Sequence, residues 1–322
     1  MKMHAHAAGA FLWTLAFIIP AAPPAHAGDV TNLVRKMSAA SEQRNYDGVF
    51  VLRKSDTLMS MRVVHGVDER GKWESLESLN GENRKVVRHN NEVISIFPER
   101  KLITVSQTLS KDSIHPTLPE NIGKLVNYYH IEKLGDDRVA GRDTAVLDVK
   151  PKDRLRYGYK YWMDNATGVL LKCDLLNEDE KIVEQMMYTE FQDHDTPPES
   201  AFRELDVSGY KREQLDQERQ VVDHTGWTVN ELPPGFMLTQ STLRHHEKTD
   251  SLHMIYSDGL ASVSVFIETG DSGDHHRLDG ATSIGALNVF GQKIDDAHVT
   301  VMGEVPEVTV ARIAQSIVKE QK

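Results

Sequence analysis

The hydrophobic pattern of the chain begins with a helical period and then changes to a strand period. Apolar residues recur every three or four positions over 29–45, which predicts one amphipathic helix. Alternating positions between short polar turns then predict strands at 48–54, 58–64, 73–79, 92–97 and 101–105. A second helix is expected at 119–127, followed by strands at 129–134, 144–150, 158–163, 168–176 and 182–191. This succession is typical of an antiparallel meander of about ten strands.

Several of the expected strands are apolar on both faces. Phe50 and Leu52 alternate with valines, and Ile94 and Ile96 have apolar neighbours on the opposite face. A sheet that is wetted on one side shows cleaner alternation, so both faces should be covered. We therefore predict a large half-open antiparallel β-barrel that encloses the helices and can hold an apolar cavity. The residues expected to line this cavity are Phe50, Met59, Met61, Ile94 and Ile96. The alternative is that the methionines fill an irregular core.

The strand pattern breaks over 192–223, where two prolines precede a charge-rich stretch with few large apolar residues. Such a stretch is typical of a connector that few contacts cross, which would let two domains move relative to each other. A second meander follows, with strands expected at 227–230, 236–244, 252–257, 261–268, 286–293 and 298–302, and Pro306 opens a closing helix.

The sequence therefore predicts an α+β protein of two domains. The first domain is expected over 28–205, a linker over 206–221, and a smaller antiparallel sheet domain with a C-terminal helix over 222–322.

The first 27 residues have the pattern of a secretory signal peptide. Lys2 is followed by an uncharged apolar run over 7–19, and Ala25-His26-Ala27 offers small residues at a cleavage site. The run is shorter than a membrane span, which needs roughly 20 apolar residues. We expect signal peptide 1–27 to be removed and the protein to be periplasmic. Cys173 is the only cysteine, so no disulfide and no lipid at the mature N-terminus is expected, and its place in an apolar strand favours a buried role.

The formal net charge is −11, so no overall field attracts nucleic acid, and no nucleic-acid partner is expected. Against this background one basic segment is interleaved with aromatic residues. Cations beside aromatic rings can hold a phosphate while the rings face apolar chains. This segment therefore supplies the candidates for an anionic lipid head group, which are Lys152, Arg154, Arg156 and Lys160. The alternative is a solvated hairpin.

The chain offers little sign of catalysis. Gly270-Asp271-Ser272-Gly273 is similar to a serine-protease nucleophile turn, but the sequence supplies no placed histidine and aspartate, and the four residues are ordinary turn chemistry. Histidines gather at His245-His246, His253 and His275-His276 without a metal-binding spacing. We expect no enzyme activity, no cofactor and no metal.

Particular strings resemble the RseB/MucB family of negative regulators of the envelope-stress sigma factor. In the first domain they are Asn45-Tyr46-Asp47-Gly48-Val49-Phe50-Val51, Val64-His65-Gly66, Leu79-Asn80-Gly81 and Tyr161-Trp162-Met163-Asp164. In the second they are Gly226-Trp227, Leu232-Pro233-Pro234-Gly235-Phe236 and the run from Tyr256 to Phe266. The resemblance implies a first domain shaped like the lipoprotein carriers LolA and LolB. It also implies binding to the periplasmic region of a membrane anti-sigma factor of the RseA/MucA type, which is shielded from the site-one protease until lipid or lipopolysaccharide displaces the regulator.

Aromatic enrichment at interfaces makes Trp227, Phe236, Tyr256 and Phe266 the candidates for partner contact, with burial in the core as the alternative. A homo-oligomer is left open. Two other functions are also left open: a soluble periplasmic carrier of lipid or lipoprotein, and, more remotely, a serine hydrolase built on Ser272.

Overall fold

The computed structural model describes residues 27–69, 71–107, 118–119, 121–198, 207–215, 219–245, 249–270 and 278–320. The expected signal peptide up to His26 and the residues Ser272, His246, His275 and His276 lie outside these ranges. Among the described residues, no helix is both long and apolar enough to cross a membrane.

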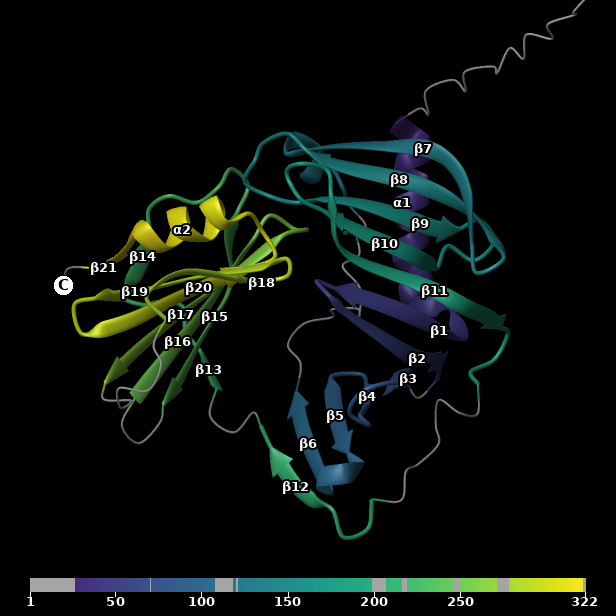
Figure 1. Ribbon diagram of the computed structural model, residues 1–322, viewed down its shortest axis with the longest axis horizontal. Coiled ribbons are helices and arrows are strands. Elements are labelled where there is room, and N and C mark those ends of the chain that lie inside the picture. The colour runs from purple at the N-terminus through teal and green to yellow at the C-terminus, as the bar shows by residue number, and fades with distance from the viewer. Residues whose placement is uncertain are drawn as a thin grey trace, which may run out of the picture.

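The first domain is built on one twelve-stranded sheet with the order β12-β6-β5-β4-β3-β2-β1-β11-β10-β9-β8-β7 (Figure 1). Its strands are β1 (Asn45–Lys54), β2 (Thr57–Asp68), β3 (Gly71–Ser78), β4 (Lys85–His89), β5 (Glu92–Phe97), β6 (Leu102–Gln107), β7 (Tyr129–Val139), β8 (Arg142–Pro151), β9 (Gly158–Asp164), β10 (Leu170–Leu176), β11 (Ile182–His194) and β12 (Lys211–Gln214). The order ends at β12 and β7, so the sheet does not close, and the prediction of a half-open antiparallel barrel is confirmed.

Helix α1 (Ala27–Gln43) covers the inner face of this sheet (Figure 1). Val34 and Met37 on its apolar stripe have almost no exposed surface, and they share one core with Phe50 of β1 and Tyr161 of β9. Burial of each such side chain stabilises the domain by about 1.5–3 kcal/mol. The helical period at the start of the chain is thus explained by packing inside the curved sheet.

The second helix expected at 119–127 is wrong in extent. Among the described residues the 3-10 helices are η1 (Pro98–Arg100) and η2 (Leu125–Asn127), of which η2 lies in this stretch. The side chain of Asn121 accepts a hydrogen bond from the backbone N–H of Gly123 at 2.9 Å. This local turn competes with helix formation, and glycine disfavours a helix further.

The second domain is a seven-stranded antiparallel sheet in the order β13-β15-β16-β17-β20-β19-β18, with one helix on it. The elements are β13 (Arg219–Val221), β15 (Met237–His245), β16 (Thr249–Ser257), β17 (Ser262–Gly270), β18 (Gly280–Ile284), β19 (Leu287–Ile294), β20 (Ala297–Gly303) and α2 (Glu307–Gln315), while β14 (Trp227–Val229) pairs with β21 (Ile317–Lys319). Val265 and Val301 of the sheet pack in one core with Val310 and Ile313 of α2. The predicted sheet with a C-terminal helix is confirmed.

The linker stretch makes more contacts than a free connector would. Strand β12 pairs in parallel with β6, and Val207 and Tyr210 pack on a small apolar cluster around Ile96 and Ile103. Within the described part of the expected linker, β12 is therefore a strand of the first sheet, where it covers apolar side chains that would otherwise face water, and β13 is a strand of the second sheet.

Candidate functional site at the junction of the two domains

A buried ion pair joins the two domains. Arg156 lies on the loop between β8 and β9, and Asp258 lies in the turn between β16 and β17. The Nη1 atom of Arg156 donates to Oδ2 of Asp258 at 2.5 Å, and neither side chain has exposed surface. The Tyr129 hydroxyl donates to the same oxygen at 2.9 Å. On the other side, Asp153 accepts from Nε and Nη2 of Arg156 at 3.1 and 2.9 Å.

Aromatic rings and a backbone carbonyl complete the surroundings of Arg156. Its guanidinium carbon lies 5.2–5.5 Å from the ring centres of Tyr128, Tyr129 and Phe236, and its Nη2 donates to the Pro234 carbonyl at 2.8 Å. Burial lowers the pKa of Arg156, but the hydrogen bonds and negative charges of its partners outweigh burial and raise it. Burial, followed by the charge of Asp258, raises the pKa of Tyr129, which keeps its hydroxyl protonated as a donor.

The loop of the second domain at 233–236 approaches the first domain so closely that it requires a glycine. Gly235 has φ +88°, and a Cβ atom there would lie 2.3 Å from the Tyr128 ring. Two further hydrogen bonds cross the junction nearby. The Asn288 amide donates to the Tyr157 hydroxyl at 3.0 Å, and the Thr309 hydroxyl donates to the Leu155 carbonyl at 2.8 Å. The two domains are therefore joined by close packing and by specific hydrogen bonds. The expectation of two lobes with few contacts between them was wrong.

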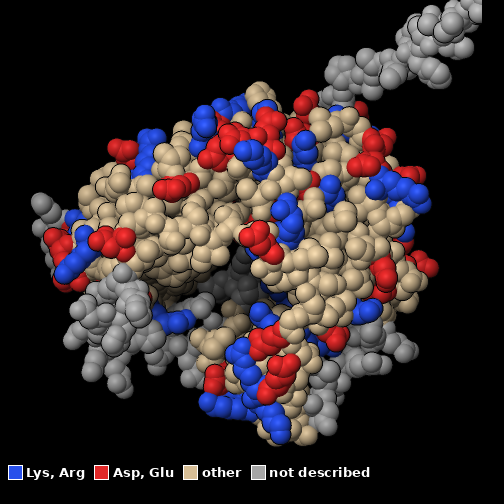
Figure 2. Space-filling view, in the orientation of Figure 1, with Lys and Arg blue, Asp and Glu red and all other residues tan. Residues whose placement is uncertain are grey.

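Figure 2 shows a hollow where the second domain, the β1–β2 region and the β4–β6 region of the large sheet meet. At the domain boundary a smaller cavity of about 200 Å³ enters the first domain, and its lining includes Phe50, Met61, Tyr159 and Met186. Glu304 of the second domain also lines it. One wall of this cavity is thus contributed by the other domain.

Three charged side chains gather at this cavity. Lys54 lies 3.0 Å from Glu184 and 3.2 Å from Glu304. Burial, and then the negative charge of Glu304, raises the pKa of Glu184, while Lys54 opposes that shift. Cys173 lies in the same wall and is buried, and burial raises the pKa of its thiol, which makes it an unreactive apolar group. A ligand would therefore meet an apolar interior with charge at its rim.

Only part of the predicted cavity lining is brought together. Phe50 and Met61 line the cavity, and Met59 points to the same face because it pairs with Leu52 on the same side. Strand pairing through β2, β3, β4 and β5 places Ser95 on the face of Phe50. Ile94 and Ile96 therefore point to the opposite face of the sheet, where they pack in the small apolar cluster with Val207 and Tyr210. Their expected place in the cavity is wrong. Alternation within one strand could not reveal this, because the facing depends on the register of every intervening hairpin.

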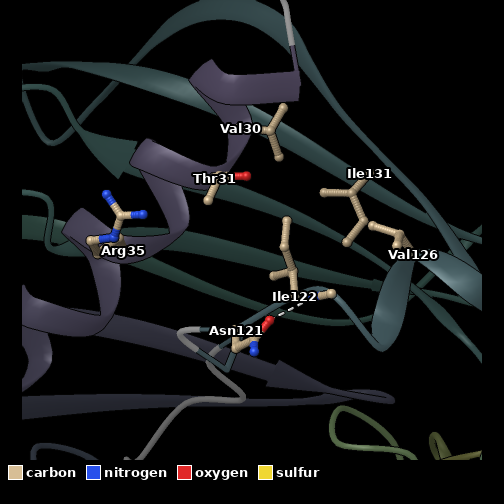
Figure 3. Close-up of a pocket in the computed structure, with 8 residues that line it drawn as sticks. Val30, Thr31, Arg35, Asn121, Ile122, Val126 and Ile131 are labelled. Carbon is tan, nitrogen blue, oxygen red and sulfur yellow. Dashed lines mark hydrogen bonds between the residues drawn. The ribbon is translucent and has the colours of Figure 1, made fainter.

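A second hollow of about 500 Å³ lies at the open side of the barrel (Figure 3). Val30 and Thr31 of α1 face Ile122, while Val126 and Ile131 close the opposite wall. Arg35 and Asn121 supply polar atoms at its border. Sequence reasoning missed this site, although the helical stripe that contains Val30 was the available signal.

The four head-group candidates do not form one site. Arg156 is fully buried in the junction, and its guanidinium is occupied by two carboxylates, so its expected role as a surface cation is wrong. Lys152 and Arg154 are exposed and Lys160 is half-buried. The ammonium of Lys152 donates to the Val126 carbonyl at 2.7 Å.

Three of the four aromatic partner candidates are core residues. Trp227, Phe236 and Tyr256 are exposed by only 8%, 7% and 5%, which places them in the packing of the second domain. Phe266 is half-buried, and its ring stacks on His253 with 4.2 Å between the ring centres. Packing in the core therefore explains why Trp227, Phe236 and Tyr256 are aromatic. Of the four candidates, Phe266 is the one that is partly exposed. Among the described residues no cluster of three potential metal ligands occurs.

Comparisons with known proteins cover both domains. The model of the MucB/RseB N-terminal domain matches residues 29–206, and that of the MucB/RseB C-terminal domain matches residues 221–318. The sigma factor AlgU regulatory protein MucB of Pseudomonas aeruginosa is 31% identical over 309 residues, with 92% of this chain and 93% of that protein covered. The sigma-E factor regulatory protein RseB of Escherichia coli is 26% identical over 290 residues, with 88% and 89% covered.

A solved structure is similar over the same span. The crystal structure of MucB in complex with MucA(peri) aligns with a TM-score of 0.71 at 28% identity, with 91% of this chain and 100% of that chain covered. The complex structure of Pseudomonas aeruginosa MucA/MucB aligns with a TM-score of 0.72 at the same identity and with the same coverage. Because the family models and the relatives both span the two domains, this chain belongs to the MucB/RseB family of sigma factor regulatory proteins.

Proposed function

We propose that this protein is a periplasmic regulator that binds the periplasmic region of a membrane-anchored anti-sigma factor. By covering that region it shields the anti-sigma factor from the site-one protease and restrains the envelope-stress response. The observation that carries the proposal is the likeness, over both domains, to MucB solved in complex with MucA(peri). A role in regulation rather than in turnover of a substrate is supported by the regulatory names of the relatives.

The location is part of the proposal. The N-terminal residues have the pattern of an export signal, and the described helices include none that could cross a membrane. The relative MucB was solved in complex with MucA(peri), and this supports a periplasmic location for the present protein as well. The domain limits 28–205, 206–221 and 222–322 belong to the same proposal.

Release by lipid or lipopolysaccharide is the second part of the proposal. The two hollows of about 500 and 200 Å³ have largely apolar linings, which suits acyl chains. Phe50 and Met61 lie where such a chain would contact the protein, and Lys152 and Arg154 remain the exposed cations for an anionic head group. A ligand that binds better to one domain arrangement, while the anti-sigma segment binds better to another, weakens that segment by reciprocity.

Co-purification tests the main proposal. The tagged full chain is isolated from its own host, and the proteins and lipids that travel with it are identified by mass spectrometry. The expected result is one membrane protein with a cytoplasmic sigma-binding region. Addition of the purified protein should slow cleavage of that partner's periplasmic region by the site-one protease. Recovery of diverse lipoproteins without such a partner would contradict the proposal and favour a carrier.

The carrier hypothesis is favoured by the apolar hollows alone. A carrier hands over its cargo and has no need of a second domain. Met61→Asp should weaken acyl-chain binding under either function. A regulator should still bind the anti-sigma segment when it carries this substitution, whereas a carrier should not bind that segment at all.

A further inference from the structure

The outer strands of the two large sheets differ in how they are protected from pairing with another chain. Proteins blunt exposed edges with charges, prolines or bulges, because unpaired backbone groups invite an additional strand. Strand β7 carries a bulge between Lys133 and Gly135, and acidic residues flank that bulge. Strand β12 carries Lys211, Arg212 and Glu213, and β13 begins with Arg219.

Strand β18 has none of these protections. Its sequence, Gly-Ala-Thr-Ser-Ile, has no charged residue and no proline, and its pairing with β19 has no bulge. Within the described residues β18 pairs with β19 alone. The side chains from Ala281 to Ile284 are exposed, and Ile284 has 71% of its surface accessible. Ile284 is thus an exposed apolar residue on an edge strand that carries no charge.

The hairpin geometry identifies the backbone groups that remain available. Ile284 pairs with Leu287 across a two-residue turn in which Gly285 has φ +63°. In such a hairpin the pair that flanks the turn exchanges both hydrogen bonds, and hydrogen-bonded pairs then alternate along the ladder. The N–H and C=O groups of Ala281 and Ser283 therefore point outward from the sheet.

The position of β18 relates it to the junction. The hairpin of β18 and β19 lies on the side of the second domain that faces the first domain (Figure 1). A Cβ atom on Gly285 would lie 3.5 Å from Cβ of Ser55 in the turn between β1 and β2. Asn288, which follows on β19, donates to Tyr157 of the first domain. A chain laid along β18 would consequently lie beside both domains, and its binding would depend on how they are arranged.

We propose that an extended segment of the anti-sigma factor adds to the free edge of β18 as a further strand of the second sheet. The backbone groups of Ala281 and Ser283 supply the hydrogen bonds, and this mode of recognition selects a proline-free segment that is apolar or uncharged where it lies beside Ile284. The inference rests on the proposed function for the identity of the partner, which relatives support as a protein segment.

The test compares two substitutions at one position in the full chain. Ala281→Pro removes an outward N–H without removing a bond to β19, because proline is tolerated on an edge strand where its nitrogen faces solvent. Ala281→Val keeps the N–H and favours a strand. Affinity for the purified periplasmic region of the cognate anti-sigma factor is measured by calorimetry. The expected result is a loss of about tenfold or more for Ala281→Pro, with the melting temperature unchanged, and near-wild-type binding for Ala281→Val.

A second variant and a direct readout keep the proposal falsifiable if the proline disturbs folding. Ile284→Lys adds an edge-protecting charge to an exposed side chain and should also weaken binding. Amide hydrogen exchange of Ala281 and Ser283 should slow when the partner is bound. Unchanged binding by folded Ala281→Pro and Ile284→Lys would overturn the edge strand and leave the proposed function intact, whereas failure of the wild-type chain to bind would remove the function itself. Concentration-dependent dimers that Ala281→Pro abolishes, with partner binding unaffected, would overturn the proposal in favour of a second copy on β18.

Discussion

The two domains meet through two sets of ion pairs that have the same chemistry and different surroundings. Arg156 and Asp258 are without exposed surface, whereas Lys54 is 43% exposed and its partner Glu304 38% exposed. Breaking a buried pair leaves an uncompensated charge and costs about 3–5 kcal/mol. An exposed pair contributes about 0–1 kcal/mol because water and salt screen it. Burial therefore decides which of the two sets specifies the domain arrangement.

The largest effect is expected from Asp258→Ala. This change leaves Arg156 charged and buried, with the partly exposed Asp153 as its remaining carboxylate partner, and the free energy of unfolding should fall by up to about 3–5 kcal/mol. Urea denaturation of the purified protein measures the loss. Replacing both partners, as Arg156→Met with Asp258→Leu, should restore much of it, because neither charge of the fully buried pair then remains to be desolvated. A double variant less stable than Asp258→Ala would contradict this account of the junction.

Acid should act on a buried group inside the first domain rather than on the junction. Burial lowers the pKa of His65 to about 4, with a smaller opposing contribution from its hydrogen bond to the Arg44 carbonyl. On acidification, His65 is therefore protonated in the unfolded chain at a higher pH than in the folded protein. The free energy of unfolding should fall by about 3 kcal/mol in total as the pH drops from about 6.5 to 4.

The variant His65→Gln isolates this contribution to the pH dependence. Glu74 lies opposite His65 on β3, and burial raises its pKa, so its protonation on acidification offsets part of the loss in both proteins. The difference between wild type and His65→Gln in unfolding free energy should shrink over this pH range. A constant difference from pH 7 to pH 4 would show that His65 does not carry the acid sensitivity.

The close approach at Gly235 should give an intermediate effect. Gly235→Ala combines the strain of φ +88° with a clash against Tyr128, and an unfolding cost of about 1–3 kcal/mol is expected. Gly209→Ala is the matched control, because Gly209 has φ +76° but nothing within 4 Å of a new Cβ atom. Equal losses in the two variants, measured as melting temperatures, would mean that the domain contact adds nothing to the backbone strain.

The smallest effect is expected from Glu304→Gln at the cavity. Because Lys54 keeps Glu184 as a partner and the rim is partly exposed, the unfolding free energy should change by no more than about 1 kcal/mol. Denaturation in low and high salt measures it, and the difference between variant and wild type should fade as salt is added. A loss as large as that of Asp258→Ala would remove the distinction between the two sets of ion pairs.

Much of the fold was predictable because strand and helix periods are local properties. The meander of the first domain, the sheet and closing helix of the second, and the apolar stripe of α1 all follow from which side chains alternate. The short η2 in place of a helix was not predicted, since the turn formed by Asn121 competes with helix formation over a few residues. Phe50 and Met61 line one cavity because they pair across the same hairpin, and its role in binding lipid stays a prediction.

The sequence by itself determined the family, the two-domain plan and the sets of residues that had to be buried, because these depend on pattern and on order along the chain. Tertiary structure decided the role of Arg156, which pairs with an aspartate 102 residues away, and the facing of Ile94 and Ile96. It also turned part of the expected linker into a strand. In each case the partner that decides the role is distant along the chain. The role of a charged side chain or an apolar face depends on the residues that are packed against it.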